Sequence, residues 1–152
     1  MVQSVSISSV SPCVRNSTSP EAKPTAINKI GLRYTNRIVK TEARSALSDW
    51  LKPTAELPKA LIESKEHFMG RIETSPQPSH LRLITVSNEP PGPDWPFGSI
   101  VMDIDRIAAD TFEPLSSKIA EKLDSLHEDV WESFSSATTP ALVESMSGTA
   151  PK

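Results

Sequence analysis

Cysteine, glycine and long apolar runs are scarce in this sequence, and each scarcity excludes a class of site or protein. The single cysteine, Cys13, rules out an internal disulfide and a cysteine-based metal site. Only five residues are glycine, and they form no Gly-rich phosphate-binding loop. No run approaches the roughly 20 apolar residues that cross a bilayer, and the first residues lack the pattern of a secretory signal. We therefore expect a cytoplasmic protein with no membrane segment and no cofactor.

Aromatic residues are also few, at 5 %, and apolar residues reach only 37 %, so the sequence can fill a modest core. Its 152 residues have room for one domain. The 14 prolines lie mostly between the periodic segments, in 12–24, 53–58, 76–78 and 90–96. We expect residues 1–26 to be disordered or weakly ordered, because a segment rich in Ser, Thr and Pro buries too little apolar surface. Residues 27–146 would form an α+β domain, complete or incomplete, and residues 147–152 a loose tail.

Charge is divided unevenly along the chain. Residues 27–85 carry ten Lys and Arg against six Asp and Glu, whereas residues 86–152 carry four against twelve. The two halves of the domain are therefore expected to attract each other, with the alternative that one face attracts an anion. The net charge of −3 argues neither for nor against nucleic acid.

Four segments have the pattern of β-strands. In 27–40, the apolar side chains of Ile30, Leu32, Tyr34 and Ile38 alternate with polar ones, which is typical of a half-buried antiparallel strand. Segments 65–74, 80–89 and 99–107 are the other predicted strands, with a turn at 75–79 and a proline-rich loop at 90–98. Segment 80–89 is apolar on both faces, which indicates an inner strand.

Helices are predicted after the first strand and after the last. A short helix is expected at 45–51, before Pro53. Pro114 would stand in the first turn of a longer one. The apolar stripe of that helix is Leu115, Ile119, Leu123, Leu126, Val130 and Phe134, and one further short helical turn is expected at 141–146. The predicted fold is α+β: an antiparallel sheet of about four strands with one long C-terminal amphipathic helix on one face.

The run Gly31-Leu32-Arg33-Tyr34, followed by Asn36-Arg37-Ile38, resembles the signature strand of a sporadically distributed bacterial family of uncharacterised proteins. The segments "LSDWLKPTAELP", "IVMDIDRI" and "LDSLHEDVWESFSSATTPALVESM" resemble later parts of that family in the same order, so the resemblance covers 27–146. It implies no activity. Because members carry a long additional segment before this strand, it implies that the chain corresponds to their C-terminal portion.

Asp103 and Asp105 are the candidate metal ligands. They stand two apart in a predicted strand and so project from one face, where paired carboxylates can hold Mg²⁺ or Mn²⁺. The competing interpretation is that they pair across the sheet with arginines of neighbouring strands, and we favour it. The arginines considered are Arg33, Arg37, Arg71 and Arg82.

The basic strand face that bears Arg33 and Arg37 is a candidate interaction surface. Phosphate binding would suit these arginines. However, a nucleic-acid-binding sheet also needs exposed aromatic rings, and alternation places Tyr34 on the opposite side, so nucleic acid is an unlikely partner. Trp95, held between prolines, either covers the sheet edge or serves as an exposed anchor. The histidines His67, His80 and His127 are too scattered for a zinc pattern.

Three functions are therefore expected, in order. The first is a non-enzymatic protein-association module, or a C-terminal fragment of a longer protein, that binds a partner or itself. The second is a metal-dependent enzyme, or its remnant, that uses Asp103 and Asp105. The third is an anion or nucleic-acid binder that uses Arg33 and Arg37.

Overall fold

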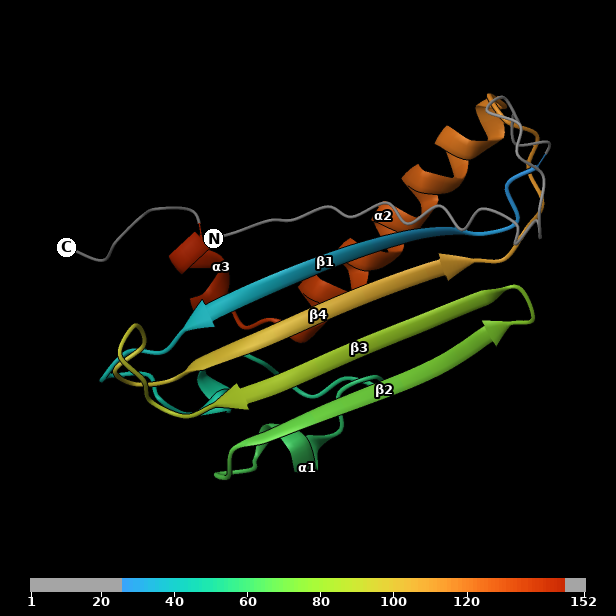
Figure 1. Cartoon of the computed structure of the whole chain (residues 1–152). Coiled ribbons are helices and arrows are strands. Elements are labelled where there is room, and N and C mark those ends of the chain that lie inside the picture. Colours follow the sequence, from blue (N-terminus) through green and yellow to red (C-terminus); the bar gives the residue numbers. More distant parts are fainter. Residues whose placement is uncertain (1–25, 147–152) are drawn as a thin grey trace, which may run out of the picture.

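The computed structural model describes residues 26–146, so the expectations for the N-terminal segment up to residue 25 and for the tail 147–152 lie outside the described residues. The described chain has the α+β fold that the sequence predicts (Figure 1). Its elements in order are β1 (Ile30–Val39), the 3₁₀ turn η1 (Leu47–Asp49), α1 (Lys59–Ile62), β2 (Phe68–Gln77), β3 (His80–Glu89), β4 (Ser99–Ala108), α2 (Ser117–Ala137) and α3 (Pro140–Met146).

The four strands form one antiparallel sheet in the order β1-β4-β3-β2. Strands β2, β3 and β4 are joined by successive hairpin connections, and β1 pairs with the far side of β4. The chain therefore crosses from one edge of the sheet to the other through 40–67, which contains η1 and α1. As predicted, β3 is an inner strand, whereas β1 and β2 are the edges.

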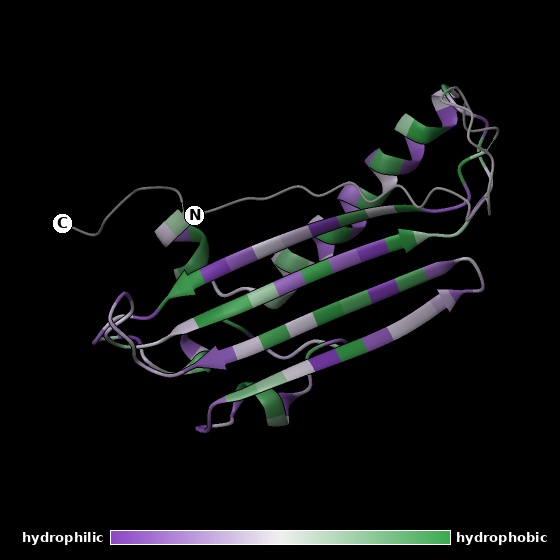
Figure 2. Ribbon diagram, in the orientation of Figure 1, coloured by the Kyte–Doolittle hydropathy of each residue, from purple (hydrophilic) through white to green (hydrophobic). Residues whose placement is uncertain are grey.

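Alternation along the strands separates the sheet into two faces (Figure 2). In β1, Leu32 and Ile38 are buried, and Arg33 and Arg37 are exposed, as the period of two predicts. In β4, the even-numbered residues 100–108 are all buried, and odd-numbered ones from Val101 to Ile107 are partly exposed. The even-numbered face receives the helices, and the other face is left open.

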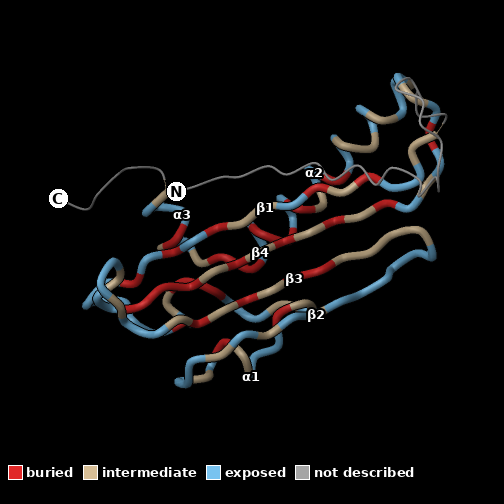
Figure 3. Tube along the Cα trace, in the orientation of Figure 1, coloured by how far each residue is buried: buried red, intermediate tan, exposed pale blue. Residues whose placement is uncertain are grey.

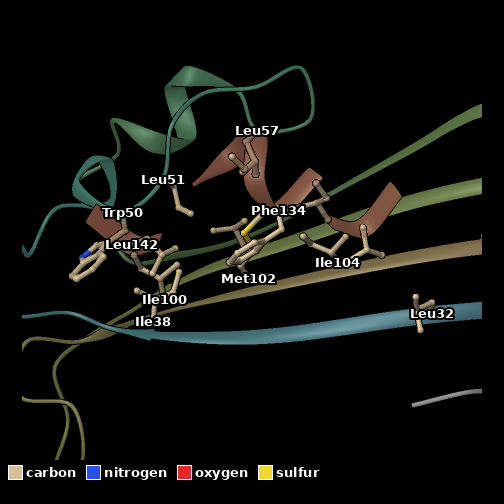
Figure 4. Close-up of a cluster of buried hydrophobic side chains, with 14 of the residues drawn as sticks. Leu32, Ile38, Trp50, Leu51, Leu57, Ile100, Met102, Ile104, Phe134 and Leu142 are labelled. Carbon is tan, nitrogen blue, oxygen red and sulfur yellow. The ribbon is translucent and has the colours of Figure 1, made fainter. Parts of the chain in front are cut away.

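The core lies between the sheet and the layer formed by α2, α3 and the crossover. Helix α2 packs on β1 and β4, with Phe134 against Met102 and Ile104 in the same buried cluster (Figure 4). Leu51 and Leu57 of the crossover enter this cluster from the helix side. Figure 3 shows that burial is concentrated on β1, β4 and β3, and that β2 is largely exposed.

One arginine is buried in this core. Arg106 of β4 is 1 % exposed, and its Nη2 donates to Glu56 Oε2 at 3.1 Å. Its Nε lies 3.3 Å from Asp129 Oδ2, and Ser133 of α2 also contacts the guanidinium. Two carboxylates therefore compensate the buried charge, which is the condition under which an interior cation is tolerated.

Several boundaries differ from the sequence prediction. Helix α2 begins at Ser117 because the hydroxyl of Ser116 accepts the N–H of Lys118 and caps it. Leu115 is therefore outside the helix, fully exposed and at a φ of 69°, so its assignment to the apolar stripe, and that of Pro114 to the first turn, are wrong.

The other differences concern lengths, and strand β2 begins at Phe68 instead of at residue 65. The helix expected at 45–51 is only the 3₁₀ turn Leu47–Asp49. Strand β2 continues to Gln77 across an irregularity in its register between Thr74 and Gln77, so the turn predicted at 75–79 is shorter than expected. The helical turn at the C-terminal end is present as α3.

Candidate functional site

The open face of the sheet brings together the charged residues that the sequence singled out. Arg33 Nε of β1 donates to Asp103 Oδ1 of β4 at 2.8 Å and to its Oδ2 at 3.0 Å. Thr35 Oγ1 also donates to Asp103 Oδ1, at 3.3 Å. The hydrogen bond to Asp103, and next its negative charge, raise the pKa of Arg33. The pair is therefore a cross-strand ion pair on a half-exposed surface.

Asp105 lies on the same face as Asp103, but its carboxylate has different surroundings. Burial raises the pKa of Asp105, and the positive charge of Arg33 opposes that effect. Neither a hydrogen bond nor an ion pair is found for this carboxylate within residues 26–146. The two aspartates are thus not an equivalent pair of ligands, because Asp103 is bound to a guanidinium. In the same described range, no three side chains of His, Cys, Asp or Glu are grouped so that they could hold a metal ion.

Arg37 forms a second cluster at the end of β1. Its Nη1 donates to Ser99 Oγ at 2.6 Å and contacts Glu89, and Ser99 Oγ donates to Glu89 Oε2 at 2.6 Å. Hydrogen bonds from Ser99 first and then from Arg37 lower the pKa of Glu89. The guanidinium lies over the Trp95 ring, 5.5 Å from its centroid. Trp95 is therefore half-buried against Arg37 and holds the loop 90–98 to the sheet.

The other arginines expected on this face are divided. Arg71 of β2 lies on the open face beside Glu73, at 3.4 Å. Arg82 of β3 is on the helix face, where it pairs with Asp129 of α2 at 2.9 Å, so its placement with the basic strand face is wrong. Side chains two residues apart in a strand lie on the same face of the sheet. Arg82 therefore lies on the same face as the buried residues Ile84 and Val86. Because β3 is apolar on both sides, its sequence did not identify which side faces the helix.

The outer edge of β1 is a further feature, which the sequence did not indicate. The N–H of Lys40 donates to the carbonyl of Gly98 at 3.1 Å, in continuation of the β1–β4 register. Hydrogen-bonded positions alternate in an antiparallel pair, so the odd-numbered residues of β1 direct their N–H and C=O groups outward. Arg33, Thr35 and Arg37 are among them. No described strand pairs with this edge.

An apolar groove runs beside this edge on the helix side. Tyr34 and Trp131 line its first part, of about 220 Å³, with Val130, Phe134 and Met146. The hydroxyl of Tyr34 lies 2.7 Å from His127 Nδ1, and this contact joins β1 to α2 at the wall of the groove. A neighbouring depression of about 400 Å³ continues past Ile38 and Leu142. Trp131 is 60 % exposed, although it belongs to the helix that packs on the sheet.

The sequence contains one signal for this groove. His127 and Trp131 stand four apart on α2, so they share one side of the helix. That side is displaced from the stripe of Leu126, Val130 and Phe134 and overhangs the edge strand. Tyr34 was assigned to the helix face, but its partner could not be named before the helix was placed.

Comparison with known proteins adds no assignment. No protein-family model, no curated protein and no solved structure matches this chain. The resemblance of 27–146 to the uncharacterised bacterial family therefore stays a prediction. Among the described helices, none combines the length and the apolar character required to span a membrane.

Proposed function

We propose that this chain is a protein-association module that binds an extended segment of a partner protein along the outer edge of β1. The outward N–H and C=O groups of Arg33, Thr35 and Arg37 beside an apolar groove carry the proposal. An added strand would extend the sheet and satisfy these groups, each new hydrogen bond contributing about 1 kcal/mol.

The side chains around the edge define the chemistry of the partner. On the helix side, an added strand would meet Tyr34, Trp131 and Met146, which suits apolar or aromatic side chains. On the open side it would lie beside Arg33 and Arg37, whose side chains are 52 % and 38 % exposed. Successive residues of a strand point to opposite faces. The partner segment is therefore one in which apolar side chains alternate with acidic or hydroxyl ones.

The opposite edge of the sheet is less suited to pairing. Strand β2 contains Pro76, which has no N–H to donate, and its register is irregular between Thr74 and Gln77. Proline and bulges are features that discourage added strands. In β1, by contrast, ten residues pair with β4 in one uninterrupted register. The difference supports β1 as the binding edge.

A displayed library of random short peptides tests the proposal with the full chain as bait. We expect selected peptides to alternate apolar and acidic residues. Thr35→Pro should abolish their binding, because its N–H points outward and its loss leaves the ladder to β4 intact. Thr35→Val keeps the N–H and is the matched control. Trp131→Ala should weaken binding, and Met69→Ala, which removes a still more exposed apolar side chain from the open face, is its control.

Two results would overturn this assignment. Selected peptides that bind Thr35→Pro as tightly as the parent would exclude the β1 edge as their site. A dimer of the parent chain in light scattering that Thr35→Pro converts to a monomer would identify a second copy, and not a partner protein, as the occupant.

The proposal includes two expectations from the sequence, membership of the uncharacterised bacterial family and a cytoplasmic location. The family resemblance is strongest in Gly31–Ile38, which is the strand that the proposal makes functional. One cysteine in 152 residues suits a reducing compartment.

A further inference from the structure

A lysine is buried at the end of β1. Lys40 directly follows the strand and is only 6 % exposed. Its Nζ donates to Asn88 Oδ1 of β3, and Asn88 Nδ2 in turn donates to the carbonyl of Glu66 at 2.8 Å. The amine is thus held at one point by a neutral amide, at the end of the sheet where β1 enters the crossover.

No acidic group compensates this cation within the part of the chain that the structure describes. All ion pairs found there involve other residues, and Asn88 is the partner of the Lys40 amine. An ammonium group has three N–H donors, so two of them face elsewhere. Burial lowers the pKa of Lys40. Interior cations are normally paired with a carboxylate, as Arg106 is in this protein, so Lys40 is an exception that needs an explanation.

Lys40 and its partner Asn88 both line a cavity of about 570 Å³. This volume lies within the range typical of sites for small organic molecules. The cavity lies between the end of β1, the turn η1, the end of α1 and the loop that precedes β4. Its wall combines apolar and hydroxyl-bearing side chains: Leu47, Ile62, Phe97, Ser45, Ser48 and Ser64.

We propose that this cavity binds a small organic anion, a carboxylate or a phosphate monoester, whose charged group is held by the Lys40 ammonium. The apolar part of the ligand would lie on Ile62 and Phe97, and the serine hydroxyls would donate to the remaining oxygens. A charged donor strengthens such hydrogen bonds. The other charged or titratable residues of the wall are Glu63, which pairs with Lys59, and Lys65 and His67, so the buried Lys40 adds to a wall that already has more basic than free acidic groups.

A structural role for Lys40 makes a different prediction. If its bond to Asn88 serves only to hold β1 to β3, then Lys40→Met should lower the thermal midpoint of the ligand-free chain. If Lys40 is an uncompensated charge kept for a ligand, Lys40→Met should leave that midpoint unchanged or raise it, because the methionine removes a buried charge at similar volume.

Calorimetric titration and thermal unfolding of the full chain test the site with named probes. These are hexanoate, phenyl phosphate and inorganic phosphate, with hexanamide as the neutral analogue. We expect hexanoate or phenyl phosphate to bind and to raise the thermal midpoint, and hexanamide to do neither. Whichever binds more tightly identifies the carboxylate or the phosphate as the natural group.

Two substitutions locate the binding. Lys40→Met should weaken it roughly tenfold or more, as expected for the loss of a charge-assisted hydrogen bond. Ser48→Phe introduces a bulky ring at another lining position and should weaken it similarly, whereas Ser125→Phe on the exposed side of α2 should not.

Three outcomes would overturn the proposal. They are no binding of any anion, equal binding by the parent and Lys40→Met, and a lowered midpoint of ligand-free Lys40→Met together with unchanged affinity in Ser48→Phe. None of these results bears on the β1 edge, which binds independently.

Discussion

Arg33 lies directly opposite Asp105 in the β1–β4 register, yet its guanidinium bonds to Asp103, the next carboxylate along the strand. The long arginine side chain reaches the diagonal neighbour, which lies within reach in an antiparallel pair. Asp103 therefore has a partner, whereas the Asp105 carboxylate is partly buried and has no hydrogen bond from any residue between 26 and 146. The two aspartates of one Asp-x-Asp motif should respond to neutralisation with opposite signs.

Asp103→Asn should destabilise the fold modestly. The substitution removes the ion pair with Arg33, and a pair of this kind contributes roughly 0.2–1 kcal/mol at a half-exposed site. A double-mutant cycle with Arg33→Ala, measured by urea unfolding, isolates the pairwise term. Glu63→Gln is the control, because its pair with Lys59 is highly exposed and should contribute nothing measurable. A coupling of zero between Arg33 and Asp103 would contradict the prediction.

Asp105→Asn should stabilise the fold at neutral pH. Because burial raises the pKa of Asp105, the folded chain retains a proton at pH values where the unfolded chain has lost it. The free energy of unfolding therefore falls as pH rises from the ordinary aspartate pKa through the raised one. Asparagine has no such charge, so the advantage of the variant should vanish in acid. Urea unfolding at several pH values checks this. A variant less stable than the parent at neutral pH would mean that the carboxylate is net stabilised by its cationic neighbours.

The buried Arg106 should be more sensitive to the loss of its partners than to its own removal. Glu56→Gln combined with Asp129→Asn leaves an uncompensated guanidinium in the core, which costs about 3–5 kcal/mol. Arg106→Met should cost less. The two carboxylates are 19 % and 22 % exposed, so they can be hydrated once the cation is gone. Denaturant unfolding of both variants decides the order, and the reverse order would refute the argument.

Gly98 should not tolerate alanine. Its φ is 84°, and an added Cβ would lie 2.5 Å from the carbonyl oxygen of Glu89. For a residue with a side chain, the positive φ alone lowers the free energy of unfolding by roughly 1–3 kcal/mol. The close contact between the added Cβ and the Glu89 oxygen lowers it further. Gly92→Ala in the same loop is the control, because no atom lies within 4 Å of its added Cβ and its φ is not positive. Equal thermal midpoints for the two variants would contradict this account.

Much of the fold follows from periodicity in the sequence, because one side of each element is buried. Strands β1 and β4 and the stripe of α2 could be predicted for this reason. Arg82 and Leu115 were misplaced because their neighbours fit two arrangements equally well. The helix spacing of His127 and Trp131 indicated one wall of the groove, but the β1 wall of the groove and the whole Lys40 cavity could not be predicted, because they depend on segments distant in sequence. Trp131 meets β1 only after α2 is packed, and Lys40 is enclosed only when the crossover and the loop 90–98 meet.

The two edges of the sheet differ, and this difference has a consequence for assembly. A subunit whose two sheet edges can both pair with further strands behaves as a bifunctional monomer, and its copies can assemble into chains of indefinite length. Here Pro76 and the irregular register of β2 disfavour an added strand at one edge, whereas β1 is regular. If β1 is the binding edge, as proposed above, the protein is monofunctional in the terms of polymer chemistry. Each binding event at β1 is also a termination step, so complexes of this chain should be finite and of fixed stoichiometry.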